Sequence, residues 1–267
     1  MTASDLRRAH EEVAERGFAV VPNVLDPDFV AQARAAMYRV RDAVVRDVGV
    51  ARLTRAGERG TLRLLFAYEP FFYRFLAIPE LLAWVDGTVG PTAILHTQNG
   101  FVLESDVSGD APDIFQHTFH RDFPRWLNGY TASTNVMFAI DPYTASTGAT
   151  MGVPGSHRWP QDVDQERARS AAVPIEADPG AMIVFDSSLW HAAGVNTSGS
   201  DRVSINHQFT RSWIKQQIDY VRAAGDAAIL ALPERTRQLL GWYTRVVTSL
   251  DEYYRPEEER LYRRGQG

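Results

Sequence analysis

The middle of the chain, from Thr92 to about Thr210, consists of short runs rich in valine, isoleucine, threonine and phenylalanine. Glycine, proline, asparagine and aspartate separate the runs, and this spacing of strand and turn residues is typical of an antiparallel sandwich or barrel. The central part of the chain is therefore limited to an antiparallel β fold. The runs are TAILHTQNGFVLE, TASTNVMFAID, TMGVPG, AMIVFD and RVSINHQF.

Helical patterns precede this β core. Residues 5–16 and 26–49 carry apolar residues at helical spacing, and the second segment opens with Asp26 as N-cap and Pro27 in its first turn. A short β-rich run, GFAVVPNVL, separates these two helices. An aromatic segment, LLFAYEPFFYRF, leads into a further helix that we expect to end at a glycine near Gly87.

The residues that follow the β core are mostly helical as well, and neither an internal repeat nor a low-complexity linker interrupts the chain. A chain of 267 residues with 45% apolar content is long enough to bury a substantial core. We predict a single domain over residues 1–267, with a β core at about 92–210 and helical flanks at 1–91 and 211–267.

Charge and composition exclude several classes of partner and site. The net charge is −5 without any block of like charges, so we expect neither a nucleic-acid nor a membrane surface. Cysteine is absent, which excludes disulfides, thiolate metal sites and a cysteine nucleophile. The N-terminus is charged from Asp5 onward, and no run approaches the ~18 apolar residues of a membrane span. We expect a cytoplasmic protein whose partner is a small molecule.

The stretch FQHTFHRDFPRW, residues 115–126, contains the tripeptide His-Arg-Asp. It is not a kinase catalytic loop, because Asn128 stands six residues after Asp122 instead of five and the other kinase motifs are missing. In a β-strand, residues i and i+2 project from the same face, so His120 and Asp122 can converge on a metal ion while Arg121 faces away. With a second histidine they would form the triad typical of non-haem Fe(II). The competing interpretation is an aspartate paired with a neighbouring arginine at a strand edge.

A second candidate segment, PGAMIVFDSSLWHAAGVNTSGSDRVSINHQF, lies downstream. It predicts a glycine turn, an apolar strand, His191 just beyond an Asp-Ser turn, and a second strand with Arg202 near its start. Arginine offers a planar fork that can hold a carboxylate in two hydrogen bonds. The alternatives are a core histidine bonded to backbone and a surface ion pair between Arg202 and Asp201.

From about Gly17 to Gln217 the chain resembles the phytanoyl-CoA dioxygenase (PhyH) family of Fe(II)- and 2-oxoglutarate-dependent oxygenases. GFAVVPNVLDPDFV is similar to the family's opening strand and helix, and His-Arg-Asp to its first metal motif. TGATMGVPGSHR and the segment from PGAMIVFDSSLWH to Arg202 resemble its later signatures, including the gap of eleven residues between His191 and Arg202. The resemblance implies a mainly β fold, a double-stranded β-helix or jelly-roll barrel, wrapped by N- and C-terminal helices.

The resemblance also implies a chemistry. Fe(II) would be held by His120, Asp122 and His191 as the catalytic centre, and Arg202 would pair with the distal carboxylate of 2-oxoglutarate. Oxidative decarboxylation of this cosubstrate by O2 would be coupled to oxidation of a substrate C–H bond. Halogenating relatives have a small residue in place of the carboxylate, so the presence of Asp122 disfavours chlorination.

Two further residues are candidate cofactor contacts. Thr150 matches a threonine that contacts 2-oxoglutarate in family members that modify natural products. Some of those members have glutamine three residues before the first metal histidine, where this chain has His117, with Gln116 one residue earlier. In a regular strand His117 would lie on the face opposite His120.

We therefore expect an Fe(II)/2-oxoglutarate-dependent dioxygenase that hydroxylates or otherwise oxidises a small natural-product-like molecule. Desaturation, epimerisation and ring formation are alternative outcomes of the same chemistry. Two other classes stay open: a metal-dependent isomerase or hydrolase on the same barrel, and a non-catalytic binding protein.

Aromatic side chains are expected to line an apolar substrate pocket beside the metal. The loop at 104–113 is expected to be either a lid or an ordinary surface loop. The C-terminal helices are expected either to cap the barrel or to form a homodimer face. The candidate pocket residues are Phe66, Tyr68, Phe71, Phe72, Phe115, Phe119 and Trp126.

Overall fold

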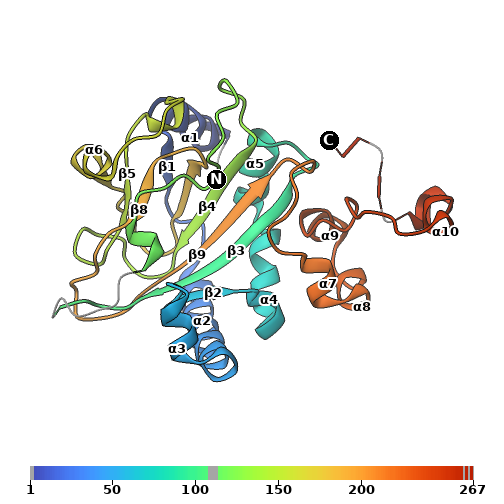
Figure 1. Ribbon diagram of the computed structural model, residues 1–267, viewed down its shortest axis with the longest axis horizontal. Helices are drawn as coiled ribbons and strands as arrows, with labels where there is room; N and C mark the ends of the chain where they lie inside the picture. The colour runs from blue at the N-terminus through green and yellow to red at the C-terminus, as the bar shows by residue number, and fades with distance from the viewer. Residues whose placement is uncertain (1–2, 108–113, 261, 264, 267) are drawn as a thin grey trace.

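The computed structural model describes residues 3–107, 114–260, 262–263 and 265–266. Two antiparallel sheets form its centre (Figure 1). Both are open, since in the described part of the chain their edge strands are not paired with each other. The six-stranded sheet has the order β1 (Phe18–Val21), β7 (Met182–Asp186), β4 (Ser133–Ala139), β9 (Arg202–Thr210), β3 (Ile94–Leu103), β2 (Thr61–Arg63). The three-stranded sheet has the order β6 (Val173–Pro174), β5 (Thr150–Gly152), β8 (His191–Ala193).

Helices come from both ends of the chain and from the loops between strands. Those before β3 are α1 (Ala3–Arg16), α2 (Pro27–Val48), α3 (Val50–Arg55), α4 (Leu65–Tyr68), the 3-10 helix η1 (Pro70–Ala77) and α5 (Pro79–Thr88). Those within the β region are η2 (Phe115–His117), η3 (Ser156–Arg158) and α6 (Gln165–Ala171). The C-terminal ones are α7 (Tyr220–Ala224), α8 (Asp226–Leu230), α9 (Glu234–Leu239), α10 (Leu250–Tyr253) and η4 (Glu257–Glu259).

Helix α2 begins where the sequence predicts it and packs on the large sheet. The Asp26 carboxylate accepts a hydrogen bond of 2.7 Å from the Phe29 amide, and Pro27 at the first turn has no N–H to leave unpaired. Gly100 of β3 lies under this helix, and a Cβ there would come within 2.5 Å of the Met37 methyl carbon. A larger residue at position 100 would therefore force the Met37 side chain to move.

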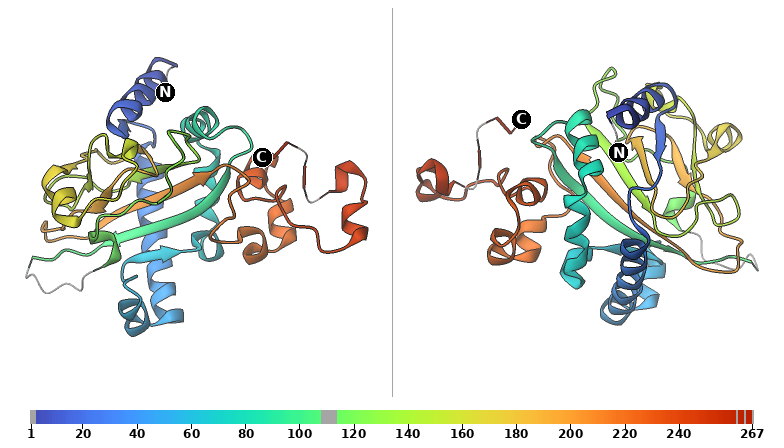
Figure 2. Two further views of the ribbon diagram at one scale, coloured as in Figure 1. Left: turned by 45° about the horizontal axis from the view of Figure 1, so that its top comes forward. Right: turned by 180° about the vertical axis from the view of Figure 1, so that it is seen from behind.

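The two faces of the large sheet differ in chemistry. Helices α2, α4 and α5 cover one face, seen from behind in Figure 2, and the small sheet lies against the other. Because strand residues alternate, Val203 and Ile205 of β9 face the helices while Ser204 and Asn206 face the small sheet. On β9 the face between the sheets is thus buried and polar, whereas β1, β4 and β7 contribute an apolar cluster to the same side, and buried polar groups need partners.

The structure differs from the predicted organisation in three respects. The molecule is mixed α and β rather than mainly β, because helices form a large part of it. Strand β1 lies in the predicted β-rich run GFAVVPNVL, but β1 and the unpredicted β2 both lie outside residues 92–210 and add to the two edges of the large sheet. Gly87 lies inside α5, which ends one residue later, and Gly90 with a φ of +94° follows.

The C-terminal segment lies beside the β3 side of the large sheet, and α10 lies farthest from the sheets (Figures 1 and 2). Ile229 and Leu239 are fully buried in the same apolar cluster as α2, whereas Trp213 and Leu230 are exposed. The predicted homodimer face stays a prediction. Within the described ranges, no helix combines the length and apolarity that crossing a bilayer requires.

His207 of β9 is the one histidine of the described residues that is fully buried in the apolar core beneath the helices. Phe75 and Phe138 surround its ring at centroid distances of 5.5 and 5.8 Å, and the Gln98 side chain lies 2.8 Å from its Nε2. Burial lowers the pKa of His207 from 6.5 to about 3, because these surroundings disfavour a charged imidazolium.

Mild acid should therefore weaken the fold through His207. Below pH 6.5 the unfolded chain binds a proton that the folded protein excludes until about pH 3, so stability falls as pH decreases across this window. The expected loss is about 1.4 kcal/mol per pH unit, or about 2 kcal/mol at pH 5. Urea unfolding at several pH values measures it. His207→Gln, which retains a polar partner for Gln98, should show a correspondingly shallower slope, and equal slopes would contradict the assignment.

Candidate active site

A pair of backbone hydrogen bonds brings His120 and His191 together. Each residue donates its N–H to the carbonyl of the other, both at 3.0 Å. In an antiparallel pair of this kind the two side chains lie on the same face, and the imidazole centroids are 4.4 Å apart. The bridge is isolated, so the predicted strand at 120–122 is reduced to a single paired residue.

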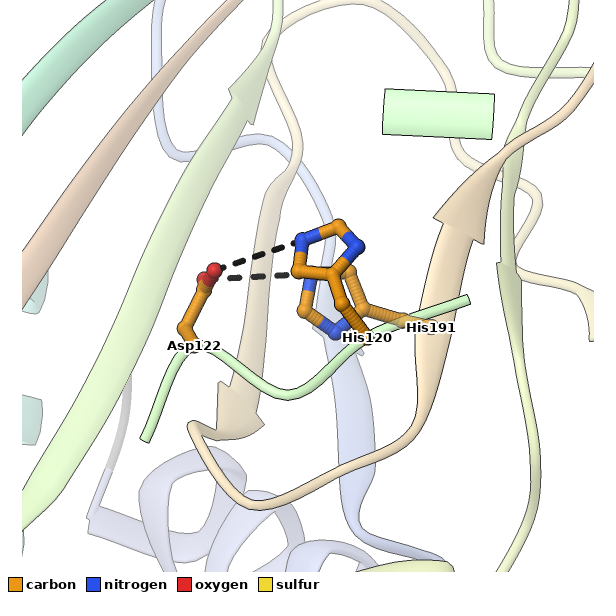
Figure 3. Close-up of side chains that lie close together, drawn as sticks. All are labelled: His120, Asp122 and His191. Carbon is orange, nitrogen blue, oxygen red and sulfur yellow. Dashed lines mark ion pairs between the residues drawn. The ribbon is translucent and has the colours of Figure 1, made fainter. Parts of the chain in front are cut away.

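The chain bends after this bridge and places Asp122 against both imidazoles (Figure 3). Nε2 of His120 lies 3.4 Å from Oδ1 of Asp122, and Nε2 of His191 lies 3.7 Å from Oδ2. The bend is held by the next amide, that of Phe123, which donates to the Ser187 carbonyl at 2.8 Å. The residues predicted to converge do so, although through a bridge and a bend rather than along one strand face.

Backbone carbonyls orient both rings. Nδ1 of His120 lies 2.8 Å from the Thr118 carbonyl, and Nδ1 of His191 lies 2.9 Å from the Leu189 carbonyl. A carbonyl only accepts, so each Nδ1 carries a hydrogen, and the Nε2 on the Asp122 side is the atom whose lone pair each ring, when neutral, can give to a metal ion. Metal-ligating histidines have this arrangement, in which the second ring nitrogen is bonded to backbone or carboxylate.

The charges within this group favour a carboxylate and a neutral His191. Burial acts to raise the pKa of Asp122, but the two imidazoles and a hydrogen bond from Asn135 outweigh it and lower the pKa to about 2. Burial and the charge of His120 lower the pKa of His191 to about 4. Burial also acts to lower the pKa of His120, but its hydrogen bond and charge interaction with Asp122 prevail and raise it. Metal binding requires an ionised carboxylate, which is present at neutral pH.

The three donor atoms fit a metal ion. They lie within 4.8 Å of one another, and adjacent ligands at bonds of about 2.1 Å would stand about 3 Å apart. A small inward movement of the side chains is therefore sufficient. Two imidazole nitrogens and one carboxylate oxygen form the donor set of non-haem Fe(II) oxygenases, in which further positions stay open.

This triad lies on the wall of a cavity of about 330 Å³ between the two sheets, and Arg202 lies on the same wall. The Arg202 side chain is buried, and it has no carboxylate partner among the described residues. Its guanidinium lies 4.2 Å from the Tyr143 ring centroid and donates to the Ser204 hydroxyl at 3.0 Å, while Nε has no partner. Asp201 pairs with Arg41 instead. A buried, unpaired guanidinium indicates that the cavity receives an anion.

The structure places the two candidate cosubstrate contacts, Thr150 and His117, in different cavities. Thr150 lies on the cavity wall, with its hydroxyl 3.8 Å from the Met137 sulfur. His117 instead lines a small separate cavity, because η2 turns the chain just before the metal motif. Gln116 takes the place on the cavity wall, and its Oε1 is buried without a hydrogen-bond partner in the described part of the chain. The 3-10 turn thus shifts the expected position by one residue.

Most of the aromatic residues predicted to line the pocket lie elsewhere. Of the seven aromatic candidates only Phe115 lines the cavity, whereas Phe66 and Phe72 are buried in the core under α2. Trp126 lines a different cavity, and the predicted lid falls largely on residues 108–113, outside the described residues. The cavity wall instead carries polar residues that the sequence analysis missed, among them His96, Asn99, Asn206 and Gln208.

Comparisons with known proteins agree with this site. The family model described as phytanoyl-CoA dioxygenase (PhyH) matches residues 13–204, a range that contains the triad and Arg202. This match and the relatives named as dioxygenases support an oxygenase. The chain belongs to the PhyH family.

Relatives and solved structures extend the comparison. The uncharacterized protein Rv1501 of Mycobacterium tuberculosis is 58% identical over 251 residues, which cover 94% of this chain and 92% of that protein. Dioxygenase af480 of Aspergillus fumigatus is 30% identical over 212 residues, covering 74% of this chain and 64% of that protein. Among solved structures, AviO1 from Streptomyces viridochromogenes Tue57 has a TM-score of 0.58 at 21% identity, covering 79% of this chain and 96% of that one. At this identity the likeness concerns the fold alone.

Proposed function

We propose that this chain is an Fe(II)- and 2-oxoglutarate-dependent oxygenase of small molecules. The observation that carries the proposal is the buried Arg202, which lacks an acid partner among the described residues and shares one cavity wall with His120, Asp122 and His191. An isomerase or hydrolase on the same metal would need no 2-oxo acid and would give Arg202 no cosubstrate role, and a non-catalytic binding protein has no evident use for the triad together with Arg202. The natural-product role is proposed from the family resemblance, and the relative named as a dioxygenase supports the oxygenase class.

Each residue has a defined task in this proposal. His120, Asp122 and His191 would hold Fe(II), and with 2-oxoglutarate and O2 this group supplies oxidation of a C–H bond coupled to decarboxylation. Arg202, whose side chain is buried, would bind the distal carboxylate of the cosubstrate. Ser204 keeps the guanidinium in place through its hydroxyl.

The finer description of the fold belongs to the same proposal. The two sheets would be the layers of a double-stranded β-helix, which is supported by the position of the cavity between them. A single domain is supported by one apolar cluster that runs from Ala9 of α1 to Tyr243 after α9.

An anaerobic titration tests the proposal without any substrate. Metal-free protein receives Fe(II) and then 2-oxoglutarate, and a visible charge-transfer band should appear when the 2-oxo acid chelates the bound iron. Surface charges are not involved, so Arg41→Ala should leave the band unchanged. If iron binds and no band forms at saturating 2-oxoglutarate, the oxygenase assignment is wrong and a metal-dependent isomerase or hydrolase becomes the better description.

A further inference from the structure

We infer that the substrate is a neutral molecule with several hydroxyl groups, such as a polyol or a sugar ring, bound by Thr61, His96 and Asn99. This inference rests on the proposed oxygenase function and names the substrate class of the same site. The three residues lie on β2 and β3, at the side of the cavity formed by the short edge strand β2 and its neighbour.

A β-bulge brings His96 into the cavity. The pairing of β3 with β9 shifts between Leu95 and Thr97, so His96 is the extra residue of the bulge. In a regular strand His96 and Thr97 would point to opposite faces, yet both line the cavity. The His96 Nδ1 is buried and has no hydrogen-bond partner among the residues that the structure describes. The His96 imidazole therefore has hydrogen-bonding capacity that no described protein group uses.

Asn99 presents a donor to the same space. Arg63 donates to the Asn99 Oδ1 at 2.6 Å, and a guanidinium can only donate, so this contact fixes the orientation of the amide. The Asn99 amide N–H group then has no acceptor in the described ranges. Beside it, the Thr61 hydroxyl is buried and also lacks a partner among these residues.

The charged residues around this part of the cavity are already neutralised. Arg59 pairs with Glu104 at 2.8 Å, and Arg63 pairs with Glu58 through two hydrogen bonds of 3.1 and 2.8 Å. The groups that lack protein partners are therefore a hydroxyl, an amide and an imidazole. These neutral groups can donate to and accept from the adjacent hydroxyl groups of a polyol, and they offer no charge to pair with a charged ligand.

The same cavity also has apolar walls, among them Phe101, Val102 and Ile114, against which the carbon faces of a ring with hydroxyl groups can pack. The Phe115 side chain is 58% exposed and its ring lies 5.0 Å from that of His120, at the metal end of the cavity. It offers one flat apolar surface next to the reactive centre. A carbon-rich substrate would instead leave the three polar groups buried and unpaired, which is costly.

Saturation-transfer NMR on the full-length chain tests the substrate class directly. The hydroxylated probes are methyl α-D-glucopyranoside and myo-inositol, and camphor serves as an apolar probe. We expect transfer to the hydroxylated probes and little to camphor. Asn99→Leu and Thr61→Val should each weaken the probes' affinity about two- to tenfold, the amount expected for a lost hydrogen bond. His96→Leu should do the same, and His96→Gln, which retains polar atoms, should weaken it less.

The control variant is His10→Gln, because His10 lies outside this cavity, on α1. Circular dichroism shows whether each variant is folded. Stronger transfer to camphor than to the hydroxylated probes, absence of transfer to them, or full affinity in folded Asn99→Leu and His96→Leu would each overturn the inference. The charge-transfer titration is independent of the probes: a band without probe binding sinks only the substrate class, whereas probe binding without a band sinks the oxygenase.

Discussion

Replacing Asp122 with alanine should reduce 2-oxoglutarate consumption by more than about 100-fold while the protein remains folded. Residues that only support a metal ligand cost about 10–100-fold when they are removed, so loss of a ligand itself should cost more. Asp122 is also the carboxylate between the two imidazoles, and without it His120 loses the partner that raises its pKa. Bound iron and succinate formation are the quantities to measure.

A matched control separates this effect from a general loss of negative charge. Asp226→Ala removes a carboxylate of α8 that pairs with Arg245 in the C-terminal segment, and it should leave consumption unchanged. Thermal melting followed by circular dichroism verifies that both variants are folded. Undiminished 2-oxoglutarate consumption in Asp122→Ala would sink the metal assignment.

Replacing Arg202 with methionine should have opposite effects on cosubstrate binding and on stability. Truncating one partner of a buried charge pair costs about 2–5 kcal/mol, so the Kd for 2-oxoglutarate should rise about 30-fold to several thousandfold. The metal-free variant should nevertheless be more stable, by about 1 kcal/mol, because a buried and unpaired charge is removed. The gain is limited by the lost contact with the Tyr143 ring.

Two measurements check this pair of effects. The charge-transfer band reports 2-oxoglutarate binding, and urea unfolding of the metal-free protein reports stability. Arg202→Lys keeps the charge and loses the planar fork, so its Kd should be intermediate. An Arg202→Met variant with unchanged Kd would show that the anion binds elsewhere, and a less stable variant would show that Arg202 has a structural partner.

The sequence identifies the residues of the site better than it identifies their surroundings. His120, Asp122, His191 and Arg202 could be found because metal ligands and an anion-binding arginine have few chemical substitutes, and their order along the chain is characteristic. The capped start of α2 was predictable for the same reason, since Asp26 followed by proline is a local signal.

The parts that were predicted wrongly depend on backbone irregularities and on long-range packing. A single 3-10 turn decides that Gln116 rather than His117 faces the cavity, and a bulge decides that His96 does. Neither the 3-10 turn nor the bulge is indicated by the amino-acid residues around it. The aromatic residues of α4 and η1 were expected at the pocket because sequence shows that they are apolar, but not which face of the sheet they cover.

The isolated bridge between His120 and His191 also limits how the cavity can open. Among the described residues, the segment that carries Phe115 and Gln116 makes its backbone hydrogen bonds to the small sheet through this pair of peptides, two residues before the carboxylate ligand. Lifting the segment to admit a molecule would pull an imidazole away from its partners. On this side of the cavity, entry of a molecule is therefore coupled to the position of a metal ligand. A substrate or product that enters or leaves without disturbing the metal centre must use another opening of the cavity. Otherwise it must enter before the metal ligands come together.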